Sequence, residues 1–224
     1  MKYSQNQVFI ILPAMIDNFK LIGQLIDQLA SEGLVFDLLI IQRKKDNPEH
    51  KSGKIIYRKL IHSKDSLLER EFLIKTLCEH YKARAYINLS GKSKEEITKK
   101  LCTKALDDVL YTHNYSPERI LGAAIGETNG NKNFKLWVVD VDFIQKLDAH
   151  SINLMLQEKV RSVINSCRPE GNKIFATIPT RHGIHFITFP FDLQEFNKAG
   201  LDAEVKKDNP TLLYYPNSLE NVPS

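Results

Sequence analysis

Hydrophobic residues recur at two spacings along the chain, and these spacings predict where helices and strands lie. Recurrence every three or four residues is typical of a helix with one buried face, whereas apolar runs and strict alternation are typical of strands. Helical spacing predicts helices over residues 15–34, 63–82, 93–112, 148–167 and 193–199. The strand patterns cover residues 34–41, 54–61, 84–89, 135–142, 174–178, 184–188 and 211–215. This mixture predicts an α/β (α+β) protein in which long helices cover a mixed sheet.

The predicted elements divide into two portions of what we expect to be one compact domain. Residues 1–115 form a helix-rich α/β portion, and residues 116–224 carry the polar motifs described below. With 224 residues and 42% hydrophobic composition, the chain has enough apolar material for one substantial core. The apolar run at 8–13 is too short to span a membrane and lacks a signal-peptide cleavage site. We therefore expect a cytoplasmic protein with no membrane partner.

Charge and cysteine usage narrow the candidate chemistry. The net charge is +4, from 31 basic and 27 acidic residues, and basic side chains concentrate at 43–45, 51–59 and 92–100. Such a surface can follow the phosphate backbone of a nucleic acid, although lysines of this kind also simply solvate helices and loops. The 3 cysteines are widely spaced, without a Cys-x-x-Cys pair. They predict reduced, buried thiols rather than a zinc site.

Two aspartates end the apolar strand at 135–142. Because side chains alternate along a strand, Asp140 and Asp142 lie on one face while Val139, Val141 and Phe143 face the core. Two carboxylates on one face repel each other unless a cation lies between them, and oxygen ligands suit Mg²⁺ or Mn²⁺. In the alternative interpretation, Asp142 caps a following helix and Asp140 faces solvent at the strand end.

A second polar group surrounds the turn between the strands at 174–178 and 184–188. Pro179 ends the first strand, Gly183 permits a tight turn, and His185 enters the second strand. The ring of His185 and the guanidinium of Arg181 can then face the same anion, for which phosphate is the natural candidate. The alternative is an ordinary hairpin whose histidine is hydrogen-bonded inside the fold.

Together these two motifs resemble those of the archaeo-eukaryotic primase superfamily, which includes primase-polymerases and the polymerase domains of bacterial end-joining ligases. Residues 137–142 are similar to its first motif, an apolar strand ending in Asp-x-Asp. Residues 180–190 are similar to its second motif, in which a small residue and a glycine-containing turn precede a histidine. Thr180 stands where serine is usual. The resemblance covers roughly the C-terminal half of the chain.

The resemblance implies a primase-polymerase fold with an RRM-like catalytic half. It also implies metal-dependent transfer of nucleotides from nucleoside triphosphates on a DNA or RNA template, in replication or repair. Any helicase or other replication protein would be a separate polypeptide. Asp140 and Asp142 would hold catalytic Mg²⁺ or Mn²⁺. The residues that would bind nucleotide phosphate are Thr180, Arg181, His182, Gly183 and His185.

The third motif of the family is an aspartate at the end of a later apolar strand, and it is not found here. The strand at 211–215 ends in Tyr214 and Tyr215 instead. The nearest acids that can substitute as a third metal ligand are Asp192 and Asp208. With two carboxylates alone, a second metal ion would be poorly held. This departure favours an alternative in which the protein is a catalytically degenerate relative that only binds nucleic acid or nucleotide.

The strand at 84–89 presents a further set of polar side chains. Arg84, Tyr86 and Asn88 alternate with Ala85 and Ile87, so one face offers a basic, an aromatic and an amide group. That face can contact a template or a sugar. It can equally be a sheet surface that faces solvent.

A third functional hypothesis comes from the histidines and tyrosines. His182, His185, Tyr214 and Tyr215 suggest a nicking or strand-transfer enzyme with a histidine-bound metal and a tyrosine nucleophile. Histidines three residues apart in an extended strand face opposite sides, so sharing a metal requires a turn at Gly183.

Overall fold

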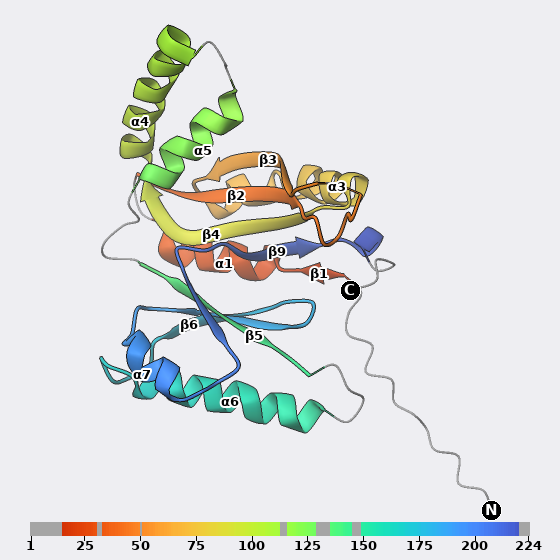
Figure 1. Ribbon diagram of the computed structural model, residues 1–224, viewed down its shortest axis with the longest axis vertical. Coiled ribbons are helices and arrows are strands. Elements are labelled where there is room, and N and C mark those ends of the chain that lie inside the picture. Colours follow the sequence, from red (N-terminus) through yellow and green to blue (C-terminus); the bar gives the residue numbers. More distant parts are fainter. Residues whose placement is uncertain are drawn as a thin grey trace, which may run out of the picture.

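A computed structural model describes residues 15–30, 33–49, 51–112, 116–128, 135–144 and 149–219. The apolar run at 8–13 and most of the loop before the acidic strand lie outside these ranges. Within them, the strands form two antiparallel sheets accompanied by helices, which confirms the predicted α+β class (Figure 1). The strand pairs of the described chain are antiparallel, so the predicted mixed sheet is not seen.

The first sheet combines both ends of the described chain. Its strand order is β1 (Ile16–Asp17), β9 (Thr211–Tyr215), β4 (Arg84–Ser93), β2 (Leu34–Gln42) and β3 (Lys54–Ile61). The helices that accompany it are α1 (Phe19–Leu29), α2 (Lys64–Leu68) and α3 (Glu71–Tyr81). Because β9 pairs with both β1 and β4, the C-terminal segment completes a sheet that the N-terminal half begins.

The second sheet is built from one continuous stretch of sequence. Its strand order is β6 (Ile174–Pro179), β7 (Gly183–Thr188), β5 (Trp137–Asp142) and β8 (Glu204–Lys207). Two helices connect these strands, α6 (His150–Ser166) and α7 (Leu193–Lys198), and α6 runs along the side of the sheet away from the first sheet (Figure 1). This is the β-α-β-β-α-β arrangement, which agrees with the RRM-like half expected from the sequence.

Alternating residues of β5 belong to different cores. Val138 packs into the core that the two sheets share with α1, whereas Val139 and Val141 pack into a second core beneath α6. The side chains of Asp140 and Asp142 therefore lie on the face of β5 that is turned toward the first sheet, as the alternation predicted.

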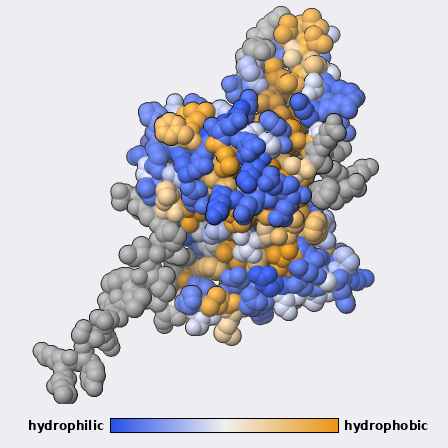
Figure 2. Space-filling model, turned by 180° about the vertical axis from the view of Figure 1, so that it is seen from behind, coloured by the Kyte–Doolittle hydropathy of each residue, from blue (hydrophilic) through white to orange (hydrophobic). Residues whose placement is uncertain are grey.

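An arm of two helices projects from the first sheet (Figure 1). It contains α4 (Lys94–Asp107), the π-helical turn η1 (Asp108–Thr112) and α5 (Pro117–Glu127). Its free end is apolar, and hydrophobic atoms gather there in Figure 2. The exposed side chains in this region are Leu106, Val109, Leu110 and Tyr111.

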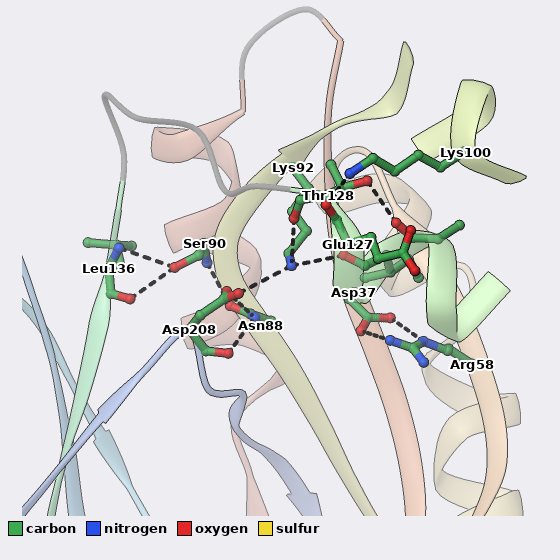
Figure 3. Close-up of polar contacts among 12 residues, drawn as sticks. Asp37, Arg58, Asn88, Ser90, Lys92, Lys100, Glu127, Thr128, Leu136 and Asp208 are labelled. Carbon is green, nitrogen blue, oxygen red and sulfur yellow. Dashed lines mark hydrogen bonds and ion pairs between the residues drawn. The ribbon is translucent and has the colours of Figure 1, made fainter. Parts of the chain in front are cut away.

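The buried Lys92 fastens this arm to the first sheet (Figure 3). Its Nζ donates to the carbonyl oxygens of Ile125 at 3.1 Å and Thr128 at 3.2 Å. It also lies 3.2 Å from a carboxylate oxygen of Asp208. Helix α5 thus belongs with the first sheet, and so does β9, so the predicted division at residue 115 does not follow the two sheets.

The long helix predicted over 63–82 is divided into α2 and α3. Ser63 caps α2 as expected, since its side chain accepts a hydrogen bond from the Ser66 backbone. The break after Leu68 rotates the following turns, so that α3 buries Ile74 and Cys78 while Phe72 is 83% exposed. Among the helices of the described residues, none combines the length and the hydrophobicity that a membrane span requires.

Candidate functional site

A cavity of about 430 Å³ opens where the two sheets meet. The first sheet contributes the end of β2 with the loop after it, the start of β4, and β9. The second sheet contributes β5, β8 and the turn between β6 and β7. Five lining side chains carry a fixed positive charge and three carry a carboxylate: Arg43, Lys45, Arg84, Arg181 and Lys206, against Asp140, Asp142 and Glu204.

The cavity brings together most of the residues predicted from the sequence. The two carboxylates of β5, the turn before β7, and the first two polar residues of β4 all line it. Asn88 does not line the cavity, and its side chain donates a hydrogen bond to Oδ1 of Asp208 at 2.9 Å. The predicted site residues that line the cavity are Arg84, Tyr86, Asp140, Asp142, Thr180, Arg181, His182 and His185.

Asp140 is held by two neighbours. Its Oδ2 lies 2.7 Å from Nζ of Lys206, and its Oδ1 lies 3.3 Å from Nε2 of His185. Burial raises the pKa of this carboxyl, but the hydrogen bonds and charges of His185 and Lys206 outweigh burial and place the pKa well below its ordinary value. Asp140 is therefore an anion throughout the physiological pH range.

The ring of His185 is clamped between the two sheets. Asp140, opposite it in the β5–β7 register, is a hydrogen-bond acceptor, so Nε2 of the ring carries the proton. The other nitrogen, Nδ1, shares a 2.9 Å hydrogen bond with the hydroxyl of Thr211. Because Thr211 lies in β9 of the first sheet and is buried, it fixes the orientation of the ring.

Gly183 is required by a close approach between strands. It pairs with Asp142, and a Cβ added to it would overlap the carbonyl oxygen of Val141. The turn is also fastened to β5 by a 2.7 Å hydrogen bond from the Phe143 backbone to the carbonyl of His182. The sequence correctly predicted that a glycine is needed at this position. The reason is the close contact between Gly183 and β5.

Tyr215 holds two guanidinium groups at the wall of the cavity. The Cζ atoms of Arg84 and Arg181 lie 4.7 Å and 4.9 Å from the centroid of its ring. Arg181 also donates a hydrogen bond to the Tyr215 hydroxyl, and Arg84 donates to Asp46. Stacking on an aromatic ring restrains a guanidinium while leaving its other donors available, so both groups are oriented before any ligand binds.

The positive charges at the cavity influence one another. Burial lowers the pKa of Lys45, and the neighbouring charges of Arg84 and Arg43 lower it further. Burial also lowers the pKa of His182, and the charges of Arg181 and Lys45 add to this effect. Cations that disfavour each other's charge in this way form a site complementary to an anion.

Neither acid proposed as a third metal ligand lines the cavity. Asp192 caps α7 by accepting hydrogen bonds from backbone nitrogens, and it forms an ion pair with Arg168 at 3.1 Å. Asp208 is bonded to Asn88 and Lys92, farther along β4, and does not line the cavity (Figure 3). The prediction that one of these two acids joins Asp140 is therefore not supported by their positions.

Glu204 is the acid that lies next to Asp140, and it was not predicted as a site residue from the sequence. It is the direct cross-strand neighbour of Asp140 in the β5–β8 pair, and it lines the cavity. Strand β8 is only four residues long and was not predicted. Its signal is the alternation of Ala203 and Val205 with Glu204 and Lys206, which is too short to stand out between two loops.

The carboxylates as arranged suit a single divalent ion better than two. Asp140 and Asp142 offer oxygen ligands on one face, as Mg²⁺ or Mn²⁺ requires. One oxygen of Asp140 is already bonded to Lys206, which also lies 3.1 Å from Glu204. Within the described ranges, no three histidine, cysteine or acidic side chains gather in a group that could hold a metal ion. An ion bound here would need further oxygen ligands, such as those of phosphate.

The tyrosines at the end of β9 are not arranged as nucleophiles. The hydroxyl of Tyr214 donates to Glu79 at 3.0 Å, and burial together with this carboxylate raises its pKa. Tyr215 is buried and its hydroxyl is bonded to Arg181. A nicking mechanism that uses either phenolate receives no support from this geometry.

Comparison of the chain with protein-family models, with curated proteins and with solved structures returned no match.

Proposed function

We propose that this protein is a primase-polymerase-like nucleotidyltransferase whose cavity binds the triphosphate of a nucleotide beside Asp140 and Asp142. The observation that carries the proposal is the opposition, in one cavity, of these two carboxylates and a cluster of cations from both sheets. Phosphoryl transfer depends mainly on positioning and charge stabilisation, and this arrangement supplies groups for both.

The cations are placed to bind phosphate oxygens. Arg84 and Arg181 are held on the Tyr215 ring, and Lys45 extends from the loop after β2. Guanidinium groups bind phosphate through paired hydrogen bonds, whereas lysine acts as a point charge. A volume of about 430 Å³ lies within the range of ordinary ligand pockets, and the excess of positive over negative lining residues matches a polyanion.

The acidic side of the cavity is where metal-dependent chemistry would occur. Mg²⁺ or Mn²⁺ held by Asp140 and Asp142 would neutralise phosphate charge and favour ionisation of an attacking hydroxyl. His185, with its Nε2 proton directed at Asp140, keeps that carboxylate oriented. The lowered pKa of Asp140 keeps it anionic and able to bind a cation.

The loop after β2 and the start of β4 would contact a DNA or RNA template. Arg43 donates to the hydroxyl of Tyr86 at 3.3 Å, which places a cation and an aromatic ring together at the cavity wall. Single strands bind such surfaces through stacking and backbone charge. We expect the protein to act in the cytoplasm, where a helicase or another replication protein is a candidate partner.

A second candidate function is favoured by one observation, namely that Lys206 already neutralises Asp140. A relative that binds nucleotide or nucleic acid without catalysis would retain the cations and tolerate this pairing. The two functions differ in whether Asp140 and Asp142 are needed for chemistry or only for the charge balance of the site.

The test is primer extension and dinucleotide synthesis with Mn²⁺ or Mg²⁺ and each nucleotide pool. We expect wild type to be active and Asp140→Asn/Asp142→Asn to lose activity while still binding a single-stranded template. The control is Asp202→Asn, an exposed acid that does not line the cavity. Absence of activity in wild type, with nucleotide still bound, would instead support the binding-only function.

A further inference from the structure

Lys206 occupies an unusual position between two carboxylates of the cavity. Its Nζ lies 2.7 Å from Oδ2 of Asp140 and 3.1 Å from Oε2 of Glu204. The two acids are directly opposite each other in neighbouring strands, and Lys206 follows Glu204 by two residues on the same face of β8. The ammonium group is thus placed by the strand register at the point where these carboxylates converge.

This position is the one that a metal ion would take if it bridged Asp140 and Glu204. A cation between two carboxylates removes their mutual repulsion, whether it is an ammonium group or a divalent metal. Burial lowers the pKa of Lys206, but hydrogen bonds to Asp140 and Glu204 outweigh burial and raise it. The side chain therefore remains charged at neutral pH.

Lys207 shows that this contact is specific to one face of the strand. It is the next residue along β8, and its Nζ lies 4.9 Å from the centroid of the Trp137 ring on the opposite side of the sheet. Lys207 is exposed, whereas the side chains of Lys206 and Asp140 are only 29% and 22% exposed to solvent. The Lys206 pair is therefore less screened by solvent than an ordinary surface ion pair.

We propose that the Lys206 ammonium is a built-in cation that takes the place of a second metal ion between Asp140 and Glu204. This inference rests on the proposed function and deepens it. The site then uses one divalent ion, bound at the Asp142 side and shared with the phosphates of the nucleotide. A second ion enters only when the charge of Lys206 is removed.

Titration with Mn²⁺ alone, followed by the electron paramagnetic resonance of the free ion, tests this proposal. Lys206→Met and Lys206→Gln remove the charge while keeping a side chain of moderate length, and Lys207→Met is the matched control on the same strand. We expect both Lys206 variants to bind Mn²⁺ at least about tenfold more tightly than wild type, or to bind one additional ion per chain. Lys207→Met should bind as wild type does.

The gain in Mn²⁺ binding by the Lys206 variants must depend on Asp140, the carboxylate that Lys206 neutralises. We therefore expect the double variant Asp140→Asn/Lys206→Met to lose the additional Mn²⁺ binding. Equal Mn²⁺ binding by wild type and both Lys206 variants would overturn the proposal. An equal gain in Lys207→Met would also overturn it, because the cause would then be a general loss of positive charge.

A separate titration with a nucleoside triphosphate in the absence of metal distinguishes this proposal from the proposed function. If wild type fails to bind the triphosphate while Lys206→Met gains Mn²⁺, the proposed function fails and the cation role of Lys206 stands. If wild type binds the triphosphate and no variant gains Mn²⁺ binding, the cation role of Lys206 fails and the proposed function stands.

Discussion

Gly183 illustrates how a single residue determines the geometry of the site. No side chain fits between it and the carbonyl of Val141, so β7 can pair with β5 at Asp142 only through a glycine. The sequence correctly indicated that this glycine matters, but it suggested a turn conformation. Contact between two backbones that are some forty residues apart in sequence cannot be seen in the local pattern.

Replacing Gly183 with alanine should therefore destabilise the protein. We expect a loss of about 1–3 kcal/mol in the free energy of unfolding, because a methyl group forces the two strands apart. The measurement is urea denaturation, with Gly126→Ala as the control. Gly126 lies in α5 with open space around it, so that change should be neutral or slightly stabilising. Equal effects of the two changes would contradict the assigned role of Gly183.

Asp140 should make stability depend on pH in a defined window. Its folded-state pKa lies below the value of about 3.9 expected for an unfolded chain, so its stabilising contribution is complete above that value. The contribution is lost as the pH falls further toward the folded-state pKa. The difference in unfolding free energy between wild type and Asp140→Asn should be constant from about pH 6 to 8 and should shrink below about pH 4. A difference that is as large at pH 3 as at pH 7 would contradict this.

Among the elements, the longer strands were predicted, whereas the short strands β1 and β8 and the helix α5 were missed. The alternation in β5 correctly assigned Asp140 and Asp142 to one face, because this strand separates two cores. The four residues of β8 give too little pattern for detection, and so Glu204 and Lys206 could not be placed in the site. One continuous helix was predicted where α2 and α3 are separate, because apolar spacing alone does not reveal the break after Leu68.

The connection from β8 to β9 depends on a buried lysine. Lys92 bonds to Asp208 and to two carbonyls at the end of α5, and the residues after Asp208 line the cavity. Asn88 supports the same loop by donating to Asp208. The arm and the cavity wall are thus fixed by one network (Figure 3).

Lys92→Met should accordingly destabilise the protein by about 1–3 kcal/mol, since two buried carbonyls lose their donor. Thermal and urea denaturation measure this effect. Lys94→Met, which removes an exposed lysine at the start of α4, is the matched control and should change stability by no more than about 0.5 kcal/mol. A similar small effect at Lys92 would show that the network contributes little.

The whole molecule is held together by a core that the two sheets share. Leu213 of β9 is buried in that core with Leu38 of the first sheet and Val138 of the second. The return of β9 to the first sheet is a contact between distant parts of the chain. Such a contact leaves no signal in the local sequence pattern, and therefore the division predicted at residue 115 does not coincide with the boundary between the two sheets.

Unfolding should therefore be a single cooperative transition. Trp137 is the only tryptophan and lies in β5, so its fluorescence reports on the second sheet, while far-ultraviolet circular dichroism reports on both. The two probes should give the same midpoint in urea. Leu213→Ala should lower both midpoints together, with a cost of about 2–5 kcal/mol. Separate midpoints would show that the sheets unfold independently.

The proposed binding of nucleotide phosphates in the cavity can be tested with two neighbouring lysines. Lys45 lines the cavity, whereas Lys44, exposed beside it in the same loop, does not. The measurement is equilibrium binding of a nucleoside triphosphate to wild type, Lys45→Met and Lys44→Met. We predict that wild type binds, that Lys45→Met weakens binding about tenfold, and that Lys44→Met has little effect. No binding by wild type, or equal losses in the two variants, would show that the cavity is not a nucleotide phosphate site.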